Sequence, residues 1–152
     1  MSEGEKNIAV NRQARFNYEL MDRVEAGLAL LGTEAKSLRE GRCSLTDGFV
    51  EIRRGEAWLI DVNIAAYSHG NRANHEPTRP RKLLLHKREI KKLTGKIAER
   101  GLTCVPLRMY FKGGVAKVEI ALARGKKKGD KREDVKTRDA QRDVRRAMKE
   151  RR

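Results

Sequence analysis

Aromatic residues, cysteines, prolines and long apolar runs are all scarce in this chain. Its 152 residues include 1 Trp, 3 Tyr, 3 Phe, 2 Cys and 3 Pro. The sequence has no run of about 18 apolar residues, the length needed to cross a membrane, and its N-terminal region lacks the apolar segment of a signal peptide. We therefore expect a soluble protein that is not exported and works in the cytoplasm.

Residues that could catalyse a reaction or bind a metal are not grouped along the chain. Cys43 and Cys104 lie far apart and neither belongs to a Cys-x-x-Cys pair, so we expect two reduced, buried thiols. The spacing of His69, His75 and His86 does not suit a zinc site. The motifs GxxxxGK(S/T), GxSxG and HExxH are absent. We expect a binding protein that is not an enzyme and needs no metal or cofactor.

Positive charge, in contrast, is abundant. The chain has 36 Lys and Arg against 21 Asp and Glu, a formal net charge of +15, and its pI is near 10.3. Such an excess is typical of proteins that bind the phosphates of a nucleic acid. The alternative, adsorption to an acidic membrane surface, requires Trp, Phe or Leu along a basic helix. The most basic region has none of these, so we expect no membrane partner.

This basic region is the tail, residues 125–152, with thirteen Lys and Arg, six Asp and Glu and no aromatic residue. It can bury too little apolar surface to offset its ordering entropy, so we expect it to be disordered when free. The composition changes at Arg124/Gly125, which divides the chain into a body, 1–124, and the tail. A helical spacing of apolar residues predicts that the tail becomes helical once phosphates neutralise it: Ala140, Val144, Ala147 and Met148.

Strands dominate the predicted body. Residues 49–60 form a hairpin that turns at Arg54-Gly55-Glu56, and residues 102–124 form another around Gly113-Gly114, a pair suited to a type I′ turn. Segment 18–31 could form a helix or a strand, and Gly27 together with the run 24–31 favours a long bent strand. On the returning arm of the second hairpin, one face is apolar and the other mixed: Val118, Ile120 and Leu122 against Lys117, Glu119 and Ala121.

Two helices interrupt the strands. Thr33 as N-cap and Gly41 beyond the end predict a short helix over 34–40. Residues 86–100 predict a longer helix, with an apolar face that includes Leu93 and Ala98 and ends at Gly101. Its opposite face is basic, and such faces are more often solvated than bound to RNA: Lys87, Arg88, Lys91, Lys92 and Lys96. Residues 66–82 are predicted to form a polar loop.

The fold class that follows is all-β-dominated: an antiparallel barrel like the oligonucleotide-binding (OB) fold, with a few helices. Single-strand binders of this fold stack bases on aromatic side chains. Aromatic residues make up only 5% of this chain, and we expect most of them in the core. The composition therefore favours recognition of a folded RNA by shape and backbone contacts.

Five sequence blocks give a more specific indication. They occur in order along nearly the whole chain: 11–15 (NRQAR), 25–28 (EAGL), 32–39 (GTEAKSLR), 77–85 (PTRPRKLLL) and 125–132 (GKKKGDKR). Together they resemble the SsrA-binding protein family (small protein B, SmpB), the partner of transfer-messenger RNA in bacteria.

The resemblance implies an OB-type barrel that binds the tRNA-like domain of transfer-messenger RNA (SsrA) and delivers it to stalled ribosomes for trans-translation. It implies that the tail enters the empty decoding site and mRNA channel of the small subunit as a helix. Alanyl-tRNA synthetase and elongation factor Tu would act on the same RNA. The matching RNA-binding positions are Asn11, Glu25, Leu84 and Lys117, and the matching ribosome-engaging positions are Gly125, Lys126, Lys127, Asp130, Lys131 and Arg132.

Some positions depart from the pattern or admit another role. Gly129 stands where many relatives have His, and Thr33 where some have an aromatic residue, so no stacking role is assigned to either. A carboxylate repels phosphate, so Glu25 would accept from a base or a 2′-hydroxyl or orient a basic neighbour. Asn11 and Glu25 could instead serve only local structure. Two other functions remain open, a structural rRNA-binding ribosomal protein and, less well supported, a nuclease.

Overall fold

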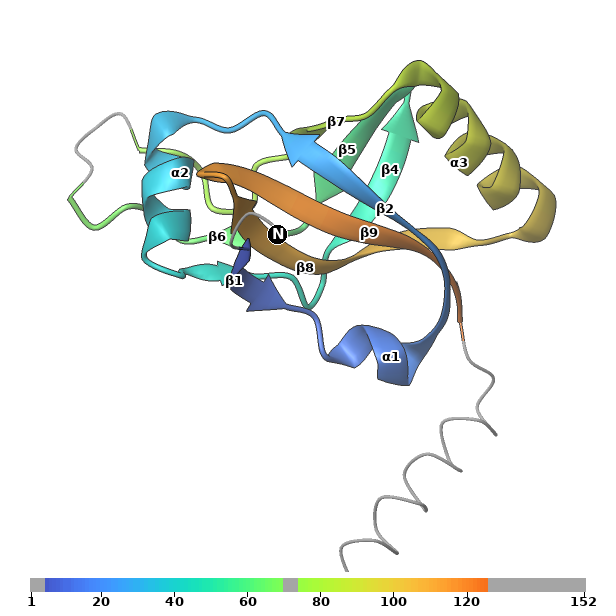
Figure 1. Cartoon of the computed structure of the whole chain (residues 1–152), viewed down its shortest axis with the longest axis horizontal. Helices are drawn as coiled ribbons and strands as arrows, with labels where there is room; N and C mark the ends of the chain where they lie inside the picture. The colour runs from blue at the N-terminus through green and yellow to red at the C-terminus, as the bar shows by residue number, and fades with distance from the viewer. Residues whose placement is uncertain (1–4, 70–73, 126–152) are drawn as a thin grey trace, which may run out of the picture.

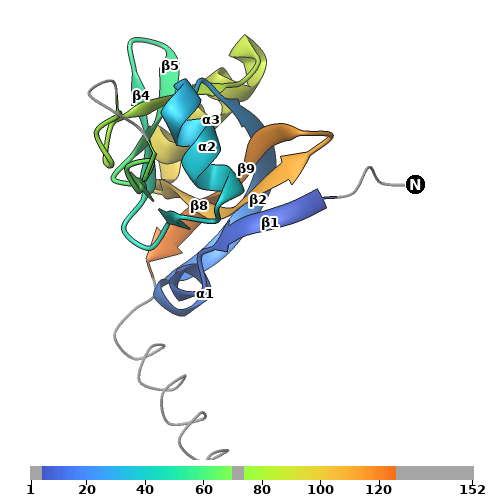
Figure 2. The same cartoon turned by 90° about the vertical axis from the view of Figure 1, so that its left-hand side faces the viewer.

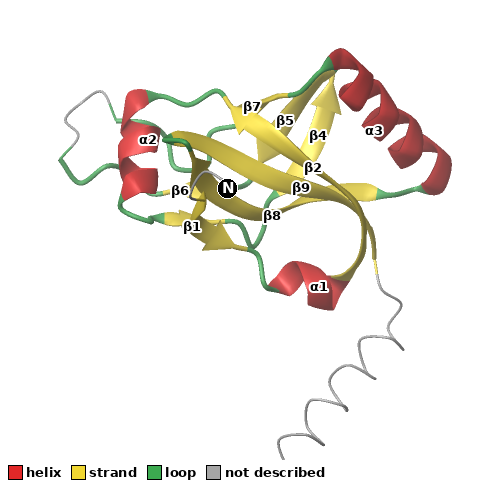
Figure 3. Ribbon diagram, viewed as in Figure 1, coloured by secondary structure: helices red, strands yellow, loops and turns green. Residues whose placement is uncertain are grey.

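A computed structural model describes residues 5–69 and 74–125 of the chain (Figure 1). Strands dominate, and three helices lie between them (Figure 3). In chain order the elements are β1 (Glu5–Val10), α1 (Gln13–Asn17), β2 (Tyr18–Leu28), α2 (Gly32–Arg39), β3 (Cys43–Ser44), β4 (Phe49–Arg53), β5 (Glu56–Ile60), β6 (Asn63–Ile64), β7 (Arg81–Leu84), α3 (Lys87–Arg100), β8 (Thr103–Lys112) and β9 (Val115–Gly125).

Seven of these strands form one antiparallel sheet in the order β1-β8-β9-β2-β7-β5-β4. The sheet curls until β4 lies against β8, which closes it into a barrel. The short strands β3 and β6 pair separately. This architecture confirms the strand-dominated, OB-like barrel expected from the sequence.

Both predicted hairpins are present, and both have two-residue turns of left-handed backbone. Gly113 and Gly114 have φ angles of 57° and 77°, as a type I′ turn requires. In the first hairpin, Arg54 and Gly55 take φ angles of 50° and 76°. The turn is therefore Arg54-Gly55 alone, and Glu56, which we had placed in the turn, is the first residue of β5.

The helices agree with the sequence in position but differ in detail. α3 follows His86, whose N–H donates to Glu89 at 3.0 Å, and Gly101 ends it at a φ of 61°. Ala98, expected on its apolar face, is exposed. α2 begins at Gly32, so Thr33 lies inside the helix and is not its N-cap. Five short elements were not predicted from the sequence: β1, α1, β3, β6 and β7.

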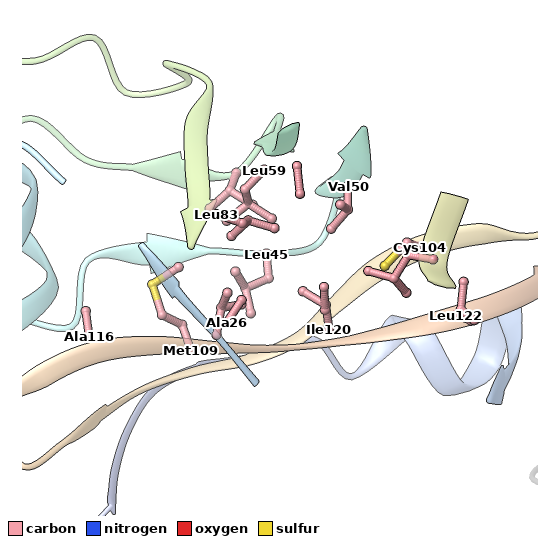
Figure 4. Close-up of a cluster of buried hydrophobic side chains, with 14 of the residues drawn as sticks. Ala26, Leu45, Val50, Leu59, Leu83, Cys104, Met109, Ala116, Ile120 and Leu122 are labelled. Atoms are coloured by element: carbon pink, nitrogen blue, oxygen red, sulfur yellow. The ribbon is translucent and has the colours of Figure 1, made fainter. Parts of the chain in front are cut away.

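The core lies inside the barrel (Figure 4). As predicted, the apolar face of β9 enters it through Val118, Ile120 and Leu122. Ala121, on the other face, joins a smaller cluster beneath α1. The prediction that most aromatic residues lie in the core was wrong, because only Tyr110 is fully buried and the other described aromatic side chains are partly exposed. Leu, Ile, Val and Ala fill the barrel instead.

The two thiols differ in their surroundings. Cys104 is fully buried and Cys43 only partly, so the expectation of two buried thiols holds for Cys104 alone. Burial raises the pKa of Cys43 to about 11 and that of Cys104 to about 12. Both thiols are therefore protonated and unreactive at neutral pH. Among the described helices, none is long and apolar enough to span a membrane.

A buried ion cluster ties α2 to the segment before β7. Glu34 is fully buried and accepts from Arg81 Nε at 2.5 Å and from Arg79 Nη2 at 2.5 Å. Arg81, which the sequence analysis placed in a polar loop, is fully buried as the first residue of β7. Its other nitrogens donate to the carbonyls of Val62 and Pro77. Burial alone would raise the pKa of Glu34, but the hydrogen bonds that it accepts, including those from Arg79 and Arg81, outweigh burial and lower that pKa.

Glu34→Gln should therefore destabilise the fold by about 3–5 kcal/mol, because it leaves two guanidinium groups without their buried counter-charge. Urea unfolding at pH 7 measures this, with Glu40→Gln at the exposed end of α2 as the control. The lowered pKa means that Glu34 contributes stability above its unfolded pKa of about 4.3, and that this contribution is lost as pH falls through its folded pKa. Equal loss of stability in both variants would contradict the assignment.

Candidate nucleic-acid interface

Three of the four predicted RNA-binding residues lie together in one groove. Glu25 on β2, Leu84 on β7 and Lys117 on β9 line an open groove of about 560 Å³. The sheet order explains this, because β2 lies between β7 and β9 and its Gly27 pairs with both Leu84 and Lys117. A side chain at Gly27 would crowd Leu84, since a Cβ there would lie 3.2 Å from Leu84 Cβ. We call this surface the β7 groove.

Glu25 has partners of its own within the protein. Its carboxylate accepts a hydrogen bond from the Tyr110 hydroxyl and lies 3.5 Å from Lys112 Nζ. The bond from Tyr110 lowers the pKa of Glu25, and Lys112 and Lys117 lower it further. Burial, followed by the hydrogen bond to Glu25 and then its negative charge, raises the pKa of Tyr110. The proton therefore stays on Tyr110, and Glu25 is an oriented, ionised acceptor at the edge of the β7 groove.

Tyr110→Phe should raise the pKa of Glu25 toward its ordinary value, because the principal donor is removed. A ¹³C NMR titration of the Glu25 carboxyl in both proteins measures the change. Tyr67→Phe is the matched control, since Tyr67 contacts a different part of the molecule. If the Glu25 titration is the same in Tyr110→Phe and in the wild-type protein, the hydrogen bond does not set its charge.

The sheet face beside the groove carries paired charges. Arg108 lies over the Tyr110 ring, 3.9 Å from its centroid, and pairs with Glu5 at 3.0 Å and Glu119 at 3.7 Å. Within the part of the chain that the structure describes, Lys117 makes no ion pair, and its charge reaches the Glu25 carboxylate only at longer range. Lys117 is thus a cation available to a phosphate, and Arg108 is largely neutralised by its neighbours.

The basic face of α3 continues from the β7 groove. His86 and Lys87, at the start of α3, line the groove, and the helix extends away from β7 (Figure 1). Lys96 pairs with Asp22. The remaining cations of this face are exposed and make no ion pair with another described residue: Lys87, Arg88, Lys91 and Lys92. A polyanion in the groove would find further positive charge along α3.

Asn11 lies elsewhere, beneath α1. It is 8% exposed, and its amide nitrogen donates to the carbonyls of Pro106 at 2.9 Å and Leu45 at 3.4 Å. Its backbone N–H donates to Leu107. Asn11 thus joins β1 to the irregularity in β8 between Pro106 and Arg108 and to the loop before β4. The structure does not bring it together with Glu25, Leu84 and Lys117.

Of the predicted tail positions, the structure describes only Gly125. It is the last residue of β9 and pairs with Tyr18 at the start of β2. The others lie outside the described residues: Lys126, Lys127, Asp130, Lys131 and Arg132.

Tyr110 was not among the predicted residues of this interface, although the sequence carries a signal for it. A two-residue turn at Gly113-Gly114 makes Lys112 and Val115 the first pair of the hairpin. Counting away from the turn, Tyr110 then pairs with Lys117, as the structure shows. The partnership of Tyr110 with Glu25 depends on the pairing of β2 with β9, which no local pattern reveals.

Comparison with known proteins gives a consistent result. A profile of the SmpB protein family matches residues 8–150. The SsrA-binding protein of Trichodesmium erythraeum (strain IMS101) is 58% identical over 149 residues, 97% of this chain and 96% of the relative. That of Carboxydothermus hydrogenoformans is 55% identical over 147 residues, 97% of this chain and 99% of the relative.

A chain in a solved structure of tmRNA and SmpB in the bacterial ribosome has a TM-score of 0.67 and 48% identity, covering 83% of this chain and 92% of that one. The relatives carry the name of a binding protein, in agreement with the expectation that the chain is not an enzyme. The matched profile and the identity to these relatives extend over almost the whole chain, so this protein belongs to the SmpB family of SsrA-binding proteins.

Proposed function

We propose that this protein binds the tRNA-like domain of transfer-messenger RNA and delivers that RNA to stalled ribosomes for trans-translation. Family membership and the names of the relatives support the choice of RNA. The observation that carries the proposal is the β7 groove, where Glu25, Leu84 and Lys117 converge from three strands.

Each of these side chains suits a different part of an RNA surface. Lys117 offers a cation to a phosphate, and Leu84, 54% exposed, offers an apolar surface to a ribose or base face. Glu25, held ionised by Tyr110, accepts from a 2′-hydroxyl or a base N–H at the groove edge. The lining has no Trp, Tyr or Phe among its described residues. Such a groove fits a folded RNA that is recognised by shape and backbone better than a stacked single strand.

We propose a separate role for the tail, in the decoding site and mRNA channel of the small ribosomal subunit. Its support is the dense positive charge of residues 125–152 and the match to the family motif at Gly125, Lys126, Lys127, Asp130, Lys131 and Arg132. A helix that forms as rRNA phosphates neutralise the chain would follow from the apolar spacing in the tail. Alanyl-tRNA synthetase and elongation factor Tu would then act on the RNA that the barrel holds.

A competition assay tests the choice of RNA. The full chain is titrated against labelled transfer-messenger RNA with unlabelled transfer-messenger RNA, an ordinary tRNA or a random RNA as competitor, at about 150 mM salt so that non-specific binding is weak. We expect transfer-messenger RNA to compete far better than the other two. Equal competition by all three, together with stoichiometric co-sedimentation with ribosomal subunits lacking transfer-messenger RNA, would favour the structural rRNA-binding alternative.

A further inference from the structure

A second hollow lies on the other side of the barrel from the β7 groove. It lies between α1 and the loop before β4. Figure 1 shows α1 at the opposite end of the molecule from β7 and the start of α3, and Figure 2 likewise shows α1 far from α3. Its volume is about 340 Å³. We call it the α1 pocket, and its polar and aromatic lining includes Asn11, Gln13, Asn17, Tyr18, Thr46 and Asp47.

We propose that the α1 pocket binds one unstacked base of a single-stranded RNA, with guanine as the preferred base. The inference goes beyond the proposed function, because it assigns a base-reading contact to a hollow separate from the β7 groove. It rests on the proposed function only in taking RNA as the polymer.

The chemistry of the lining favours a base over a phosphate. Gln13 and Asn17 from α1 and Thr46 and Asp47 from the loop before β4 contribute amides, a hydroxyl and a carboxylate. These four side chains make no hydrogen bond to another described residue. The lining includes no Lys or Arg, although the chain carries a net charge of +15. Amides can bind a base edge or a phosphate, but a carboxylate repels phosphate and accepts from base N–H groups, so a lining with Asp47 and no cation favours a base.

The pocket is held in shape before any ligand arrives. A Cβ at Gly48 would lie 2.6 Å from Val62 Cγ2 and 3.1 Å from the Leu45 carbonyl, so only glycine fits there. The Gly48 N–H closes the turn by donating to that carbonyl at 2.9 Å. The Asn11 amide binds the same carbonyl and thereby fixes the loop that carries Thr46 and Asp47. A preformed site loses less entropy on binding.

The surroundings of the pocket suit a nucleotide within a chain. The rings of Tyr18 and Phe49, both partly exposed, line it and offer faces on which a base can stack. Arg12 and Arg15 of the same α1 region are exposed and make no ion pair with another described residue. Both line the adjoining hollow, which shares Asn11 with the α1 pocket, and can bind a phosphate next to the inserted base.

Asp47 determines the preferred base. A carboxylate accepts two hydrogen bonds side by side, and the Watson–Crick edge of guanine offers N1–H and the N2 amino group next to each other. Adenine and cytosine each offer one amino group on this edge, and uracil a single N–H between two carbonyls that would repel the carboxylate. We therefore expect guanine to bind best and uracil worst.

Fluorescence anisotropy with labelled pentaribonucleotides tests the proposal on the full chain. The probes are UUGUU, UUUUU and a pentamer with an abasic central residue, which all carry the same phosphates. We expect UUGUU to bind about tenfold more tightly than the other two, the discrimination typical of one bidentate base contact. The Gln13 and Asn17 side-chain NH₂ signals in a ¹⁵N NMR spectrum should shift with UUGUU only.

Asp47→Ala and Asn17→Ala should remove this preference while leaving the affinity for the tRNA-like domain unchanged, which also shows that both variants are folded. Lys117→Glu should keep the preference, so failure of the proposed function and failure of this inference are distinguishable. Equal affinity for the three pentamers would overturn the inference, as would a preference that survives in Asp47→Ala. If free GMP competes as well as UUGUU, the site binds a nucleotide and the assignment to RNA is wrong.

Discussion

Lys117→Glu should weaken binding of the tRNA-like domain by about one to two orders of magnitude at physiological salt. Lys117 lines the β7 groove and makes no ion pair with another described residue, so the reversal removes a phosphate contact and adds a repulsive charge. Glu25 would then face a second carboxylate across the groove. Filter binding or anisotropy with the isolated tRNA-like domain measures the loss.

Lys6→Glu is the matched control for this prediction. It makes the same change in net charge at an exposed position on β1, which forms the edge of the sheet and lies outside the β7 groove. We expect a loss of no more than about twofold, from the general field of the protein. Equal losses in the two variants would mean that net charge, and not the groove, determines the affinity.

Removal of residues 126–152 should abolish tagging of stalled peptides while changing affinity for the tRNA-like domain by no more than about threefold. The reason is spatial, because β9 ends at Gly125 beside Tyr18, far from the β7 end of the barrel (Figure 1). RNA binding and ribosome engagement would then use different parts of the chain. Reconstituted translation of a message without a stop codon measures tagging, and gel shift measures affinity.

A full-length variant separates the tail's length from its charge. Replacement of Lys126, Lys127, Lys131 and Arg132 by Ala keeps the chain length and removes four cations. We expect tagging to be lost here as well, with affinity for the RNA retained. If truncation instead removes RNA binding, the proposed division between body and tail is wrong.

The hairpins and α3 could be predicted from the sequence because their signals are local. Gly113-Gly114 accepts a positive φ at both positions, and the spacing of Ile90, Leu93 and Ile97 defines a helix face. The β7 groove could be assembled only through the family resemblance. Its residues come from strands distant in sequence, and their adjacency depends on sheet order.

Other features could not be predicted because tertiary contacts override local patterns. Arg81 follows two prolines in a polar stretch, and only the buried carboxylate of Glu34 makes its complete burial favourable. For Asn11 the sequence left both RNA binding and a local structural role open, and the structure buries its side chain against carbonyls of β8 and the loop before β4. In both cases the partner lies more than thirty positions away along the chain.

An NMR chemical-shift map of the full chain with the isolated tRNA-like domain tests whether the β7 groove holds the RNA. We expect the largest amide shifts around Gly27, Leu84 and Lys117 and along the first turn of α3, with little change around α1. Shifts concentrated on α1 and the loop before β4, with the β7 groove unchanged, would contradict the central claim that this groove holds the RNA.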